Sequence, residues 1–450
     1  MLRLSWTQPE DLAPHALRAA DLDGIPVDDL VADWAAAGGA DEPAVSGATA
    51  EPAPEKVRTL AREILSHIDT RPAPETLRAA EPDRLEEILR LAAPAPRLAT
   101  DTSLDRIHGA WLGRAAGCLL GKPVEKIPRD GIRAIAESTG NWPLQSYFTE
   151  VGLDPLVADR FPWNRRSRPT SLVENISGMP EDDDLNFPLI ALDLLERVGP
   201  DFTVDDVAQS WLANLPGGRV FTAERIVYRN LLDGIEPDQA ATAGNPFSDW
   251  IGAQIRTDVY GWASPGDPAR AARLAHADGW LSHRRSGLYG ALFAAAASSA
   301  AVVASTVDEV LAAGLSVVPV DSRYAAAIRR GAELGRSDLD LDDALDAIYA
   351  DFGHLHWVHA LNNSALLAFA LARGNGDFTA TVTAAVSGGW DTDSVGATAG
   401  SISGALTGAS RLPSSWIDPL QNRLASSVPG FDGIGFDELA RRTLALGARS

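Results

Sequence analysis

Apolar residues recur at intervals of three and four along the first hundred residues. One set comprises Val57, Leu60, Ile64, Leu65 and Ile68, and a second comprises Leu85, Ile88, Leu89 and Ala92. Such spacing lines one face of an α-helix. Segments rich in Pro, Ala and Gly at 38–54 and 92–103 interrupt the pattern, and such segments are typical of loops and linkers. We therefore predict that residues 1–100 form a helical N-terminal extension, in which nothing points to chemistry.

The chain after residue 104 is dominated by alanine-rich helical patterns. They run over 289–304, 341–350 and 362–372, with Gly and Pro in the segments between them. Alternation of apolar and polar residues, which indicates a strand, is scarce. The best strand candidate, 315–320, contains a proline and is equally well the end of a helix. The pattern predicts an all-α fold, with one large domain over 104–450.

Composition and charge narrow the classes of partner. Of the 450 residues, 45% are hydrophobic and 22% are charged, as in an ordinary globular protein. The net charge of −22 argues against nucleic acid as a partner, because phosphate contacts need clustered cations. The sequence shows neither an apolar signal segment nor a membrane-length apolar run, so we expect a cytoplasmic protein without a membrane partner. The single cysteine, Cys118, excludes an intrachain disulfide.

Two sets of glycines are spaced by four residues. The first set is Gly109, Gly113, Gly117 and Gly121, and the second is Gly396, Gly400, Gly404 and Gly408. Each set lies on one face of a predicted helix, where a glycine costs about 0.5–1 kcal/mol relative to alanine. We therefore expect another backbone to approach both faces closely, with the two helices buried at the centre of the domain.

Two groups of acidic residues stand at predicted helix starts. Asp391 and Asp393 head the second glycine helix, after a turn at 388–390, and the run 181–184 precedes an apolar segment with helical period. One interpretation is simple helix capping, because the helix dipole favours negative charge at this end. The other is metal binding, since oxygen ligands without His or Cys suit Mg²⁺, Mn²⁺ or Ca²⁺ rather than zinc. Two ions become plausible if the two groups meet.

Three segments together resemble the ADP-ribosylglycohydrolases, a family that includes the dinitrogenase reductase-activating glycohydrolases. They are 109–125 (GAWLGRAAGCLLGKPVE), 181–184 (EDDD) and 388–394 (GGWDTDS), in the order that the family has them. The likeness spans about 104–410. It implies an all-α, orthogonal multi-helix domain that holds two Mg²⁺ (or Mn²⁺) ions against the ribose next to the scissile bond.

The resemblance also implies roles for individual residues. The implied metal ligands are Glu181, Asp182, Asp183, Asp391, Asp393 and Ser394. Glu125, which follows the first glycine set, is expected near the metals and the ribose. Glu181 and Asp184 stand where the family usually has threonine, and Cys118 where many members have aspartate, so the substrate range stays open.

The implied reaction is hydrolysis of a ribosyl C1″ bond. Such a reaction passes through an oxocarbenium-like state and needs a positioned water and an acid for the leaving group. In this hypothesis Glu125, or a water held by the metals, acts as the base, and Asp183 orients the attacking water.

Further residues are expected to surround the substrate. They are Gly388, Gly389, Trp390, His359, Asn363, Arg256 and His283. His359 and Asn363 lie one helical turn apart on one face, although a structural histidine is the alternative. Arg256 could meet a diphosphate, because the acidic chain needs local cations for an anionic ligand; an ordinary salt bridge is the alternative.

Three functions therefore stay open. The leading hypothesis is a hydrolase of ADP-ribosylated protein or a related ADP-ribosyl or nucleotide-like compound. The second is a hydrolase of a small-molecule N-riboside or NAD-derived metabolite in a biosynthetic pathway. The third is a non-catalytic relative that binds ADP-ribose. The presence of both aspartate pairs together with Glu125 favours an enzyme.

Overall fold

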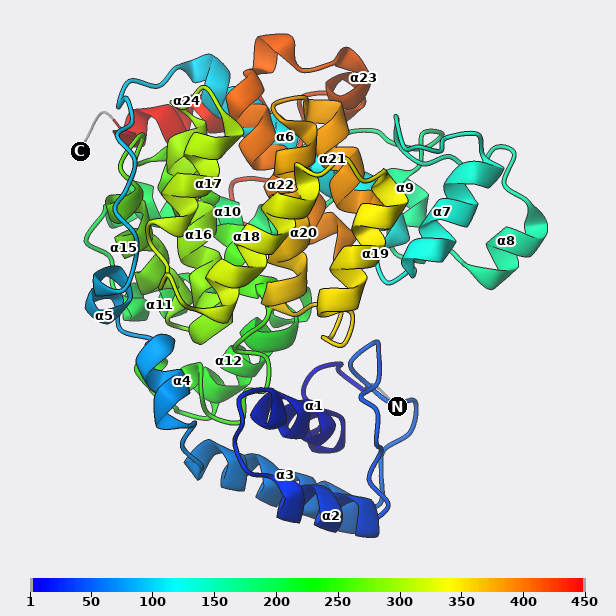
Figure 1. The fold of residues 1–450 in the computed structure, drawn as a ribbon, viewed down its shortest axis with the longest axis vertical. Helices are drawn as coiled ribbons and strands as arrows, with labels where there is room; N and C mark the ends of the chain where they lie inside the picture. The colour runs from blue at the N-terminus through cyan, green and yellow to red at the C-terminus, as the bar shows by residue number, and fades with distance from the viewer. Residues whose placement is uncertain (1–2, 448–450) are drawn as a thin grey trace.

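The computed structural model describes residues 3–447, and its regular elements in this range are helices (Figure 1). Isolated bridges, but no sheet, occur among these residues. The all-α prediction is confirmed. No helix in the described part of the chain combines the length and apolar character that crossing a bilayer requires.

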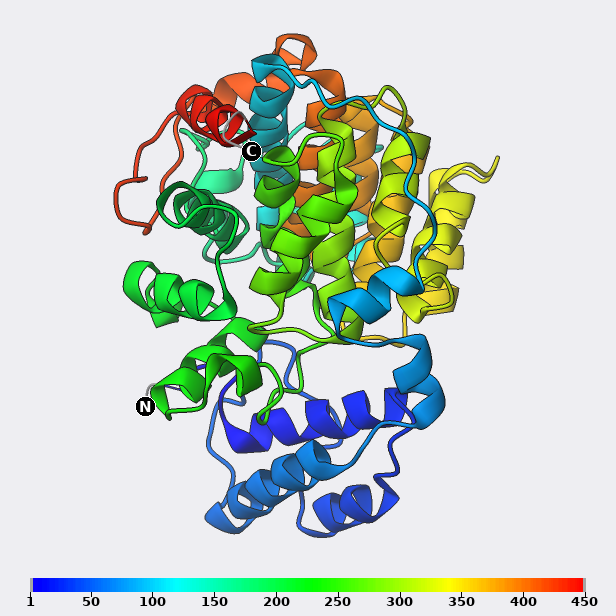
Figure 2. The same ribbon diagram turned by 90° about the vertical axis from the view of Figure 1, so that its left-hand side faces the viewer.

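The N-terminal region folds beside the larger body of the molecule (Figures 1 and 2). Its helices are α1 (Pro9–Leu22), α2 (Asp28–Ala36), α3 (Glu55–Thr70), α4 (Glu75–Ala80) and α5 (Leu85–Arg90). Helices α1, α2 and α3 bury a small core of their own, which includes Leu17, Trp34 and Ile64. Trp6 and Ile88 instead belong to the main core, so this region is packed firmly onto the rest.

The larger body is an assembly of helices of very different lengths. Its α-helices are α6 (Leu104–Gly121), α7 (Arg129–Ser138), α8 (Pro155–Arg160), α9 (Arg168–Ser171), α10 (Asp183–Arg197), α11 (Val204–Asn214), α12 (Thr222–Leu232), α13 (Pro237–Ala240), α14 (Asp258–Trp262), α15 (Pro268–Gly279), α16 (Arg285–Ala301), α17 (Val307–Leu315), α18 (Arg323–Gly335), α19 (Leu341–Phe352), α20 (Ala360–Gly374), α21 (Phe378–Ser387), α22 (Thr392–Thr407), α23 (Ser414–Ile417) and α24 (Phe436–Gly447). Its 3₁₀ helices are η1 (Lys122–Val124), η2 (Gly217–Arg219), η3 (Ile251–Arg256), η4 (Ala409–Arg411) and η5 (Asp418–Leu420).

The three alanine-rich patterns fall on α16, α19 and α20. The ambiguous segment 315–320 forms the end of α17 and the turn after it. An isolated antiparallel bridge between Ala92 and Pro319 joins this segment to the N-terminal region. The helix-end interpretation of this segment is therefore the one observed.

Helices α6 and α22 contact each other along their glycine faces. Gly109 faces Gly404 and Gly117 faces Gly396, so the two helices run antiparallel. A Cβ atom on any of these glycines would overlap a backbone carbonyl of the other helix. The close backbone approach predicted from the glycine spacing is confirmed at every predicted position except Gly408, which lies past the end of α22 with a φ of 80° and faces the Asp105 side chain.

This pairing places the C-terminus of α6 beside the N-terminus of α22. The Thr392 hydroxyl donates to the carbonyl of Gly121 at 2.8 Å. The segments that leave α6 and enter α22 therefore start from adjacent points, and these segments carry Glu125 and Asp391.

A buried arginine of α6 fixes the start of α10 to the same place. Arg114 Nε donates to the carbonyl of Asp184 at 2.7 Å, and its Nη1 donates to Asp258 Oδ2 at 2.8 Å. The acidic run 181–184 is thereby held against the α6–α22 pair.

Candidate active site

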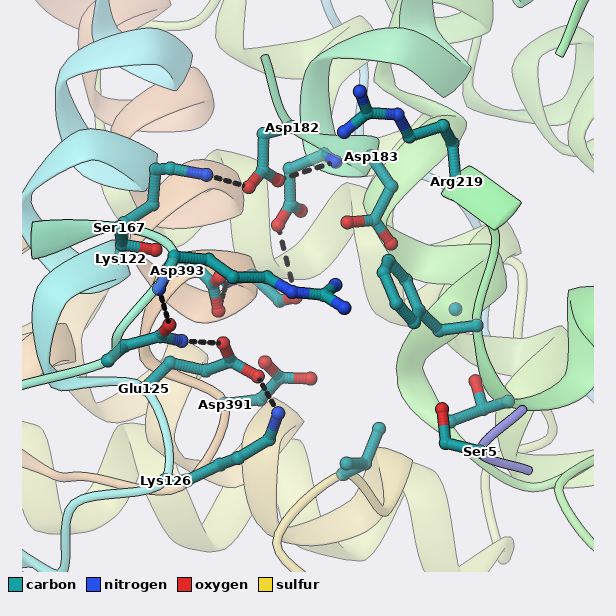
Figure 3. Close-up of a pocket in the computed structure, with 18 of the residues that line it drawn as sticks. Ser5, Lys122, Glu125, Lys126, Ser167, Asp182, Asp183, Arg219, Asp391 and Asp393 are labelled. Carbon is teal, nitrogen blue, oxygen red and sulfur yellow. Dashed lines mark hydrogen bonds and ion pairs between the residues drawn. The ribbon is translucent and has the colours of Figure 1, made fainter. Parts of the chain in front are cut away.

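A cavity of about 600 Å³ opens where these three segments meet (Figure 3). The acids in its lining are Glu125, Glu181, Asp182, Asp183, Asp184, Glu224, Asp391 and Asp393, and Ser394 lines it with them. This volume is in the range of small-molecule sites. The fold thus brings together both acidic groups and Glu125, which are far apart in the sequence.

Glu125, Asp391 and Asp393 form a compact carboxylate group. One oxygen of each lies within 4.8 Å of the others. Asn164 Nδ2 donates to Glu125 Oε2 at 2.6 Å, and Lys126 Nζ lies 2.9 Å from Glu125 Oε1. The carboxylate of Glu125 is therefore held in one orientation by an amide on one oxygen and an ammonium group on the other.

Burial and the neighbouring carboxylates raise the pKa values of both aspartates in this group. Burial, together with Glu125 and Asp182, raises the pKa of Asp393 to about 7. Burial, together with Asp393 and Glu125, raises the pKa of Asp391 well above its usual range. Nearby like charges in a poorly solvated site disfavour ionisation. A cation would relieve this repulsion, because metal ligands bind in their deprotonated forms.

Asp182 and Asp183 face the cavity in different electrostatic states. Asp182 caps α10, with Oδ1 accepting from the Asp184 N–H at 2.9 Å, and its Oδ2 pairs with Lys122 Nζ. Burial raises the pKa of Asp182, but Lys122 outweighs it and holds that pKa below the ordinary value. Burial, Asp182 and Asp393 raise the pKa of Asp183 well above its ordinary value. Asp182 is therefore a carboxylate stabilised by its ion pair with Lys122. The negative charge of Asp183, in contrast, is destabilised by the acids around it.

The carboxylates of Asp184 and Glu181 are engaged by other groups. Ser394 Oγ donates to Asp184 Oδ2 at 3.2 Å. Asn186 Nδ2 donates to Glu181 Oε1 at 3.1 Å, and Arg219 lies 3.1 Å from Glu181 Oε2. Glu181 also belongs to neither of the close groups of potential metal ligands among the described residues, which makes it a poorer candidate for a metal ligand than the sequence indicated.

The donors present fit a hard divalent cation. The group of Glu125, Asp391 and Asp393 offers carboxylate oxygens alone, which suit Mg²⁺, Mn²⁺ and Ca²⁺. A second close group consists of Cys118, Asp182 and Asp184. Burial, with Asp182 and Asp184, raises the pKa of the Cys118 thiol well above its ordinary value, and only the thiolate is an effective ligand. The first group is therefore the better cation site.

Comparison with known protein families shows to which family this chain belongs. The model of the ADP-ribosylglycohydrolase family matches residues 99–449. The chain belongs to the ADP-ribosylglycohydrolase family. The resemblance read from the three sequence segments is thereby confirmed, and the family supports hydrolysis of a glycosidic bond.

A solved structure described as "ADP-ribosylglycohydrolase-related protein complex" is similar at 23% identity and a TM-score of 0.47, over 77% of this chain and 98% of that one. No curated protein matches this chain.

In this family member, the turn before Asp391 is stabilised from outside the cavity. Gly389 and Trp390 both have positive φ angles, of 76° and 60°. The Trp390 ring stacks on Tyr349 with centroids 4.4 Å apart, and the Tyr349 hydroxyl donates to the carbonyl of Gly388 at 2.8 Å. Gly388, Gly389 and Trp390 are not part of the cavity lining. Their observed contacts position Asp391 instead of forming the expected substrate surface.

His359 and Asn363 also act behind the cavity. His359 caps α20, with Nδ1 accepting from the Leu361 N–H at 3.2 Å. Asn363 Oδ1 accepts from the Asp391 N–H at 3.3 Å. Neither residue belongs to the lining, so the structural alternative describes His359, and Asn363 is a positioning residue for Asp391.

Arg256 and His283 are buried next to the cavity wall rather than in it. Arg256 Nη1 lies 2.6 Å from Glu224 Oε1, and Arg256 Nε forms a second ion pair with Asp278 Oδ1. His283 Nδ1 shares a hydrogen bond with Ser282 Oγ at 2.7 Å. Two acids already neutralise the Arg256 guanidinium, so the salt-bridge alternative is observed and this arginine is not directed at a diphosphate.

The structure adds cavity residues that the sequence reasoning missed. Residues 3–6 of the N-terminal region line the same cavity. Arg225 Nη1 donates to the carbonyl and hydroxyl oxygens of Ser5 at 3.0 and 2.9 Å. Lys122 and Lys126 also line the cavity, on either side of the acids. The lysines lie in or beside the segment 109–125 and could have been found there, whereas nothing in the sequence links Ser5 to the acids.

Proposed function

We propose that this protein hydrolyses the C1″ glycosidic bond of an ADP-ribosyl compound, with Mg²⁺ or Mn²⁺ bound by Asp391 and Asp393 and with Glu125 beside them as the base. The observation that carries the proposal is the convergence of these three carboxylates on one cavity, opposite Asp183. Family membership supports the reaction class. The sequence led to an expectation of two ions, and this carboxylate group suits one of them.

Each side chain has a defined part in the proposed reaction. Glu125, oriented by Asn164 and Lys126, accepts a proton from the attacking water. The water oxygen bonds to C1″ while the bond between C1″ and the leaving nitrogen or oxygen breaks, and the proton that Glu125 accepted is returned to the leaving atom. Asp183, in the facing wall, orients the water. A divalent cation held by Asp391 and Asp393 would supply Lewis acidity and help to orient the ribose hydroxyl groups.

The rest of the lining favours an anionic substrate. Its arginines, apart from Arg3, are Arg165, Arg166, Arg219 and Arg225. Arg225 is buried, and burial with Arg166 lowers its pKa to about 10, so it stays charged at neutral pH. Arginine binds phosphate oxygens strongly. These cations take the place that the sequence reasoning gave to Arg256.

A free ribosyl metabolite is the second candidate substrate. Residues 3–6 lie outside the region that the family model matches, yet they line the cavity. A wall supplied by an additional segment limits the space for a leaving group, which favours a small molecule over the side chain of an intact protein.

The test is a substrate panel with Mg²⁺ or Mn²⁺. It contains ADP-ribosyl-arginine and ADP-ribosyl-serine, both as peptides and on protein, ADP-ribose 1″-esters, NAD and nicotinamide riboside. We expect turnover of at least one compound, and its loss in Glu125→Gln. The matched control is Glu137→Gln, which changes an exposed acid of α7. Binding of ADP-ribose without turnover of any compound would instead favour the non-catalytic alternative, and full activity in Glu125→Gln would remove the assigned base.

A further inference from the structure

Arg225 is a buried arginine of the cavity lining that forms no ion pair within residues 3–447. Both hydrogen bonds of its guanidinium in this range start at Nη1, and the buried Nε–H has no partner there. Burial and Arg166 lower the pKa of Arg225, and Asp183 offsets them only in part. A buried cation is unfavourable without an anion, so a negatively charged ligand is the partner that would compensate it.

The group that holds Arg225 comes from the N-terminal region. Its Nη1 donates to the carbonyl oxygen and the hydroxyl oxygen of Ser5 at 3.0 and 2.9 Å. Because Ser5 is neutral, these bonds orient the guanidinium without neutralising it. The Phe221 ring, with its centroid 4.9 Å from Arg225 Cζ, supports the same group. The cation is thereby fixed in place while its charge stays available to a ligand in the cavity.

Ser5 is itself held between two anchors. On one side, the ring of Trp6 belongs to the main core. On the other, Arg3 lies 3.0 Å from each of the carboxylates of Glu10 and Asp11 in α1. The folded N-terminal region therefore presents Ser5 to the cavity, and Figure 3 shows Ser5 and the labelled acids in the same close-up.

Buried ion pairs fix the N-terminal region to the larger body. Asp23 pairs with Arg285 and, at 2.9 Å, with Arg323, which also lies 2.7 Å from Glu81. Both acids are buried, and separating such a pair would leave an uncompensated charge. Residues 3–6 are therefore a permanent wall of the cavity, although they lie outside the part of the chain that the family model matches.

We infer that the N-terminal region determines specificity at this site: Ser5 positions Arg225 to receive a phosphate group of the substrate, so that phosphorylated ribosyl compounds are selected over uncharged ribosides. Guanidinium groups bind phosphate oxygens through directed, charge-assisted hydrogen bonds. Arg166 also lines the cavity and is near enough to repel Arg225, and two neighbouring cations suit the multiple charge of a phosphate. The inference rests on the proposed function, because it concerns the substrate of the same cavity.

The test is binding measured by calorimetry in the presence of Mg²⁺. ADP-ribose and adenosine are the probes, since adenosine shares the nucleoside but lacks the phosphates. We expect adenosine to bind the wild type at least about tenfold more weakly than ADP-ribose. Ser5→Ala removes one of the two hydrogen bonds to Nη1 and should weaken ADP-ribose binding by about three- to tenfold. Neither adenosine binding nor the urea unfolding midpoint should change.

The effect of Ser5 should depend on Arg225. In the Arg225→Met background, Ser5→Ala should change the affinity for ADP-ribose by less than about twofold, because the group that Ser5 positions is gone. The matched control is Ser66→Ala, which removes an exposed hydroxyl from α3 of the same region and should leave ADP-ribose binding unchanged.

Four results would overturn the inference: no binding of ADP-ribose, equal affinity for the two probes, unchanged binding in Ser5→Ala, or losses that simply add in the double variant. The wild-type comparison of the two probes decides even if a variant does not fold.

The outcome is separable from that of the substrate panel. ADP-ribose binding that depends on Ser5 and Arg225, without turnover of any panel compound, refutes the proposed hydrolysis and leaves the inference intact. Turnover of an ADP-ribosyl compound with the same kcat/KM in Ser5→Ala as in the wild type does the reverse.

Discussion

Replacing Gly113 by alanine should force helices α6 and α22 apart. The added Cβ would overlap the carbonyl oxygen of Gly400 and lie 3.0 Å from the Cα of Gly404. Both neighbours are backbone atoms in buried helices, so no side-chain rotation can relieve the overlap. The substitution therefore tests whether the glycine faces hold the centre of the domain together.

The expected magnitude follows from two opposing effects. Inserting a methyl group into a packed core costs about 1–3 kcal/mol, and more where the backbone has to move. Alanine in place of glycine returns about 0.5–1 kcal/mol through helix propensity. We expect a net loss of about 2 kcal/mol in the free energy of unfolding. Mn²⁺ affinity should fall as well, because the same contact sets the positions of Glu125 and Asp391.

Urea unfolding, with Mn²⁺ titration of the folded protein, measures both effects. Gly447→Ala is the matched control, because a Cβ at this α24 residue would lie at an ordinary 3.9 Å from the Pro265 ring. The control should stay within about 0.5 kcal/mol of the wild type. The reasoning would be refuted if Gly113→Ala were as stable as the wild type and bound Mn²⁺ equally well.

Other predictions concern charge and pH. Burial and Arg18 lower the pKa of His15 to about 3, so the unfolded chain takes up the proton first as pH falls below about 6.5. Between pH 7.5 and pH 5 the wild type should therefore lose about 2 kcal/mol more stability than His15→Leu in urea unfolding; equal losses would contradict this. Arg225→Met should weaken ADP-ribose binding at least about tenfold in calorimetry, since a charged hydrogen bond contributes about 1.5–3 kcal/mol, whereas Arg273→Met, at an exposed site on α15, should not. Arg114→Met leaves Asp184 and Asp258 buried without their cation and should cost about 3–5 kcal/mol; a loss below 1 kcal/mol would show that these acids are protonated instead. Finally, Mn²⁺ at a hundredfold excess over its Kd should raise the unfolding free energy by about 2.7 kcal/mol, and Asp391→Asn should abolish this gain.

The fold was predictable where local pattern and packing agree. Alanine-rich periodicity located α16, α19 and α20, and the glycine spacing indicated that α6 and α22 touch. These signals are readable because a helix repeats its faces every three to four residues. The same pairing explains why Glu125 and Asp391 meet, since Glu125 follows the end of α6 and Asp391 precedes the start of α22.

The rest of the site depends on contacts that no local pattern encodes. Ser5 reaches the cavity because Trp6 packs among His15, Phe247 and Trp250. Arg256 could not be told from Arg225 by residue type alone, yet the first is neutralised by two buried acids and the second lines the cavity. Charge partners thus decided which arginine is available, and partners are a property of the folded chain.

The balance of charge at the cavity argues that a ligand, and not stability, accounts for the acidic cluster. Glu181 and Glu224 pair with Arg219 and Arg256, and the remaining carboxylates of the lining are Glu125, Asp182, Asp183, Asp184, Asp391 and Asp393. The cations paired with them are Lys122, Lys126 and Arg114. Apolar residues of similar volume would stabilise a buried site at least as well as such ion pairs do. Because these carboxylates exceed the cations paired with them and several have raised pKa values, the folded protein carries a repulsion that a bound divalent cation would remove. That unfavourable charge is the feature of the site which a purely structural role leaves unexplained.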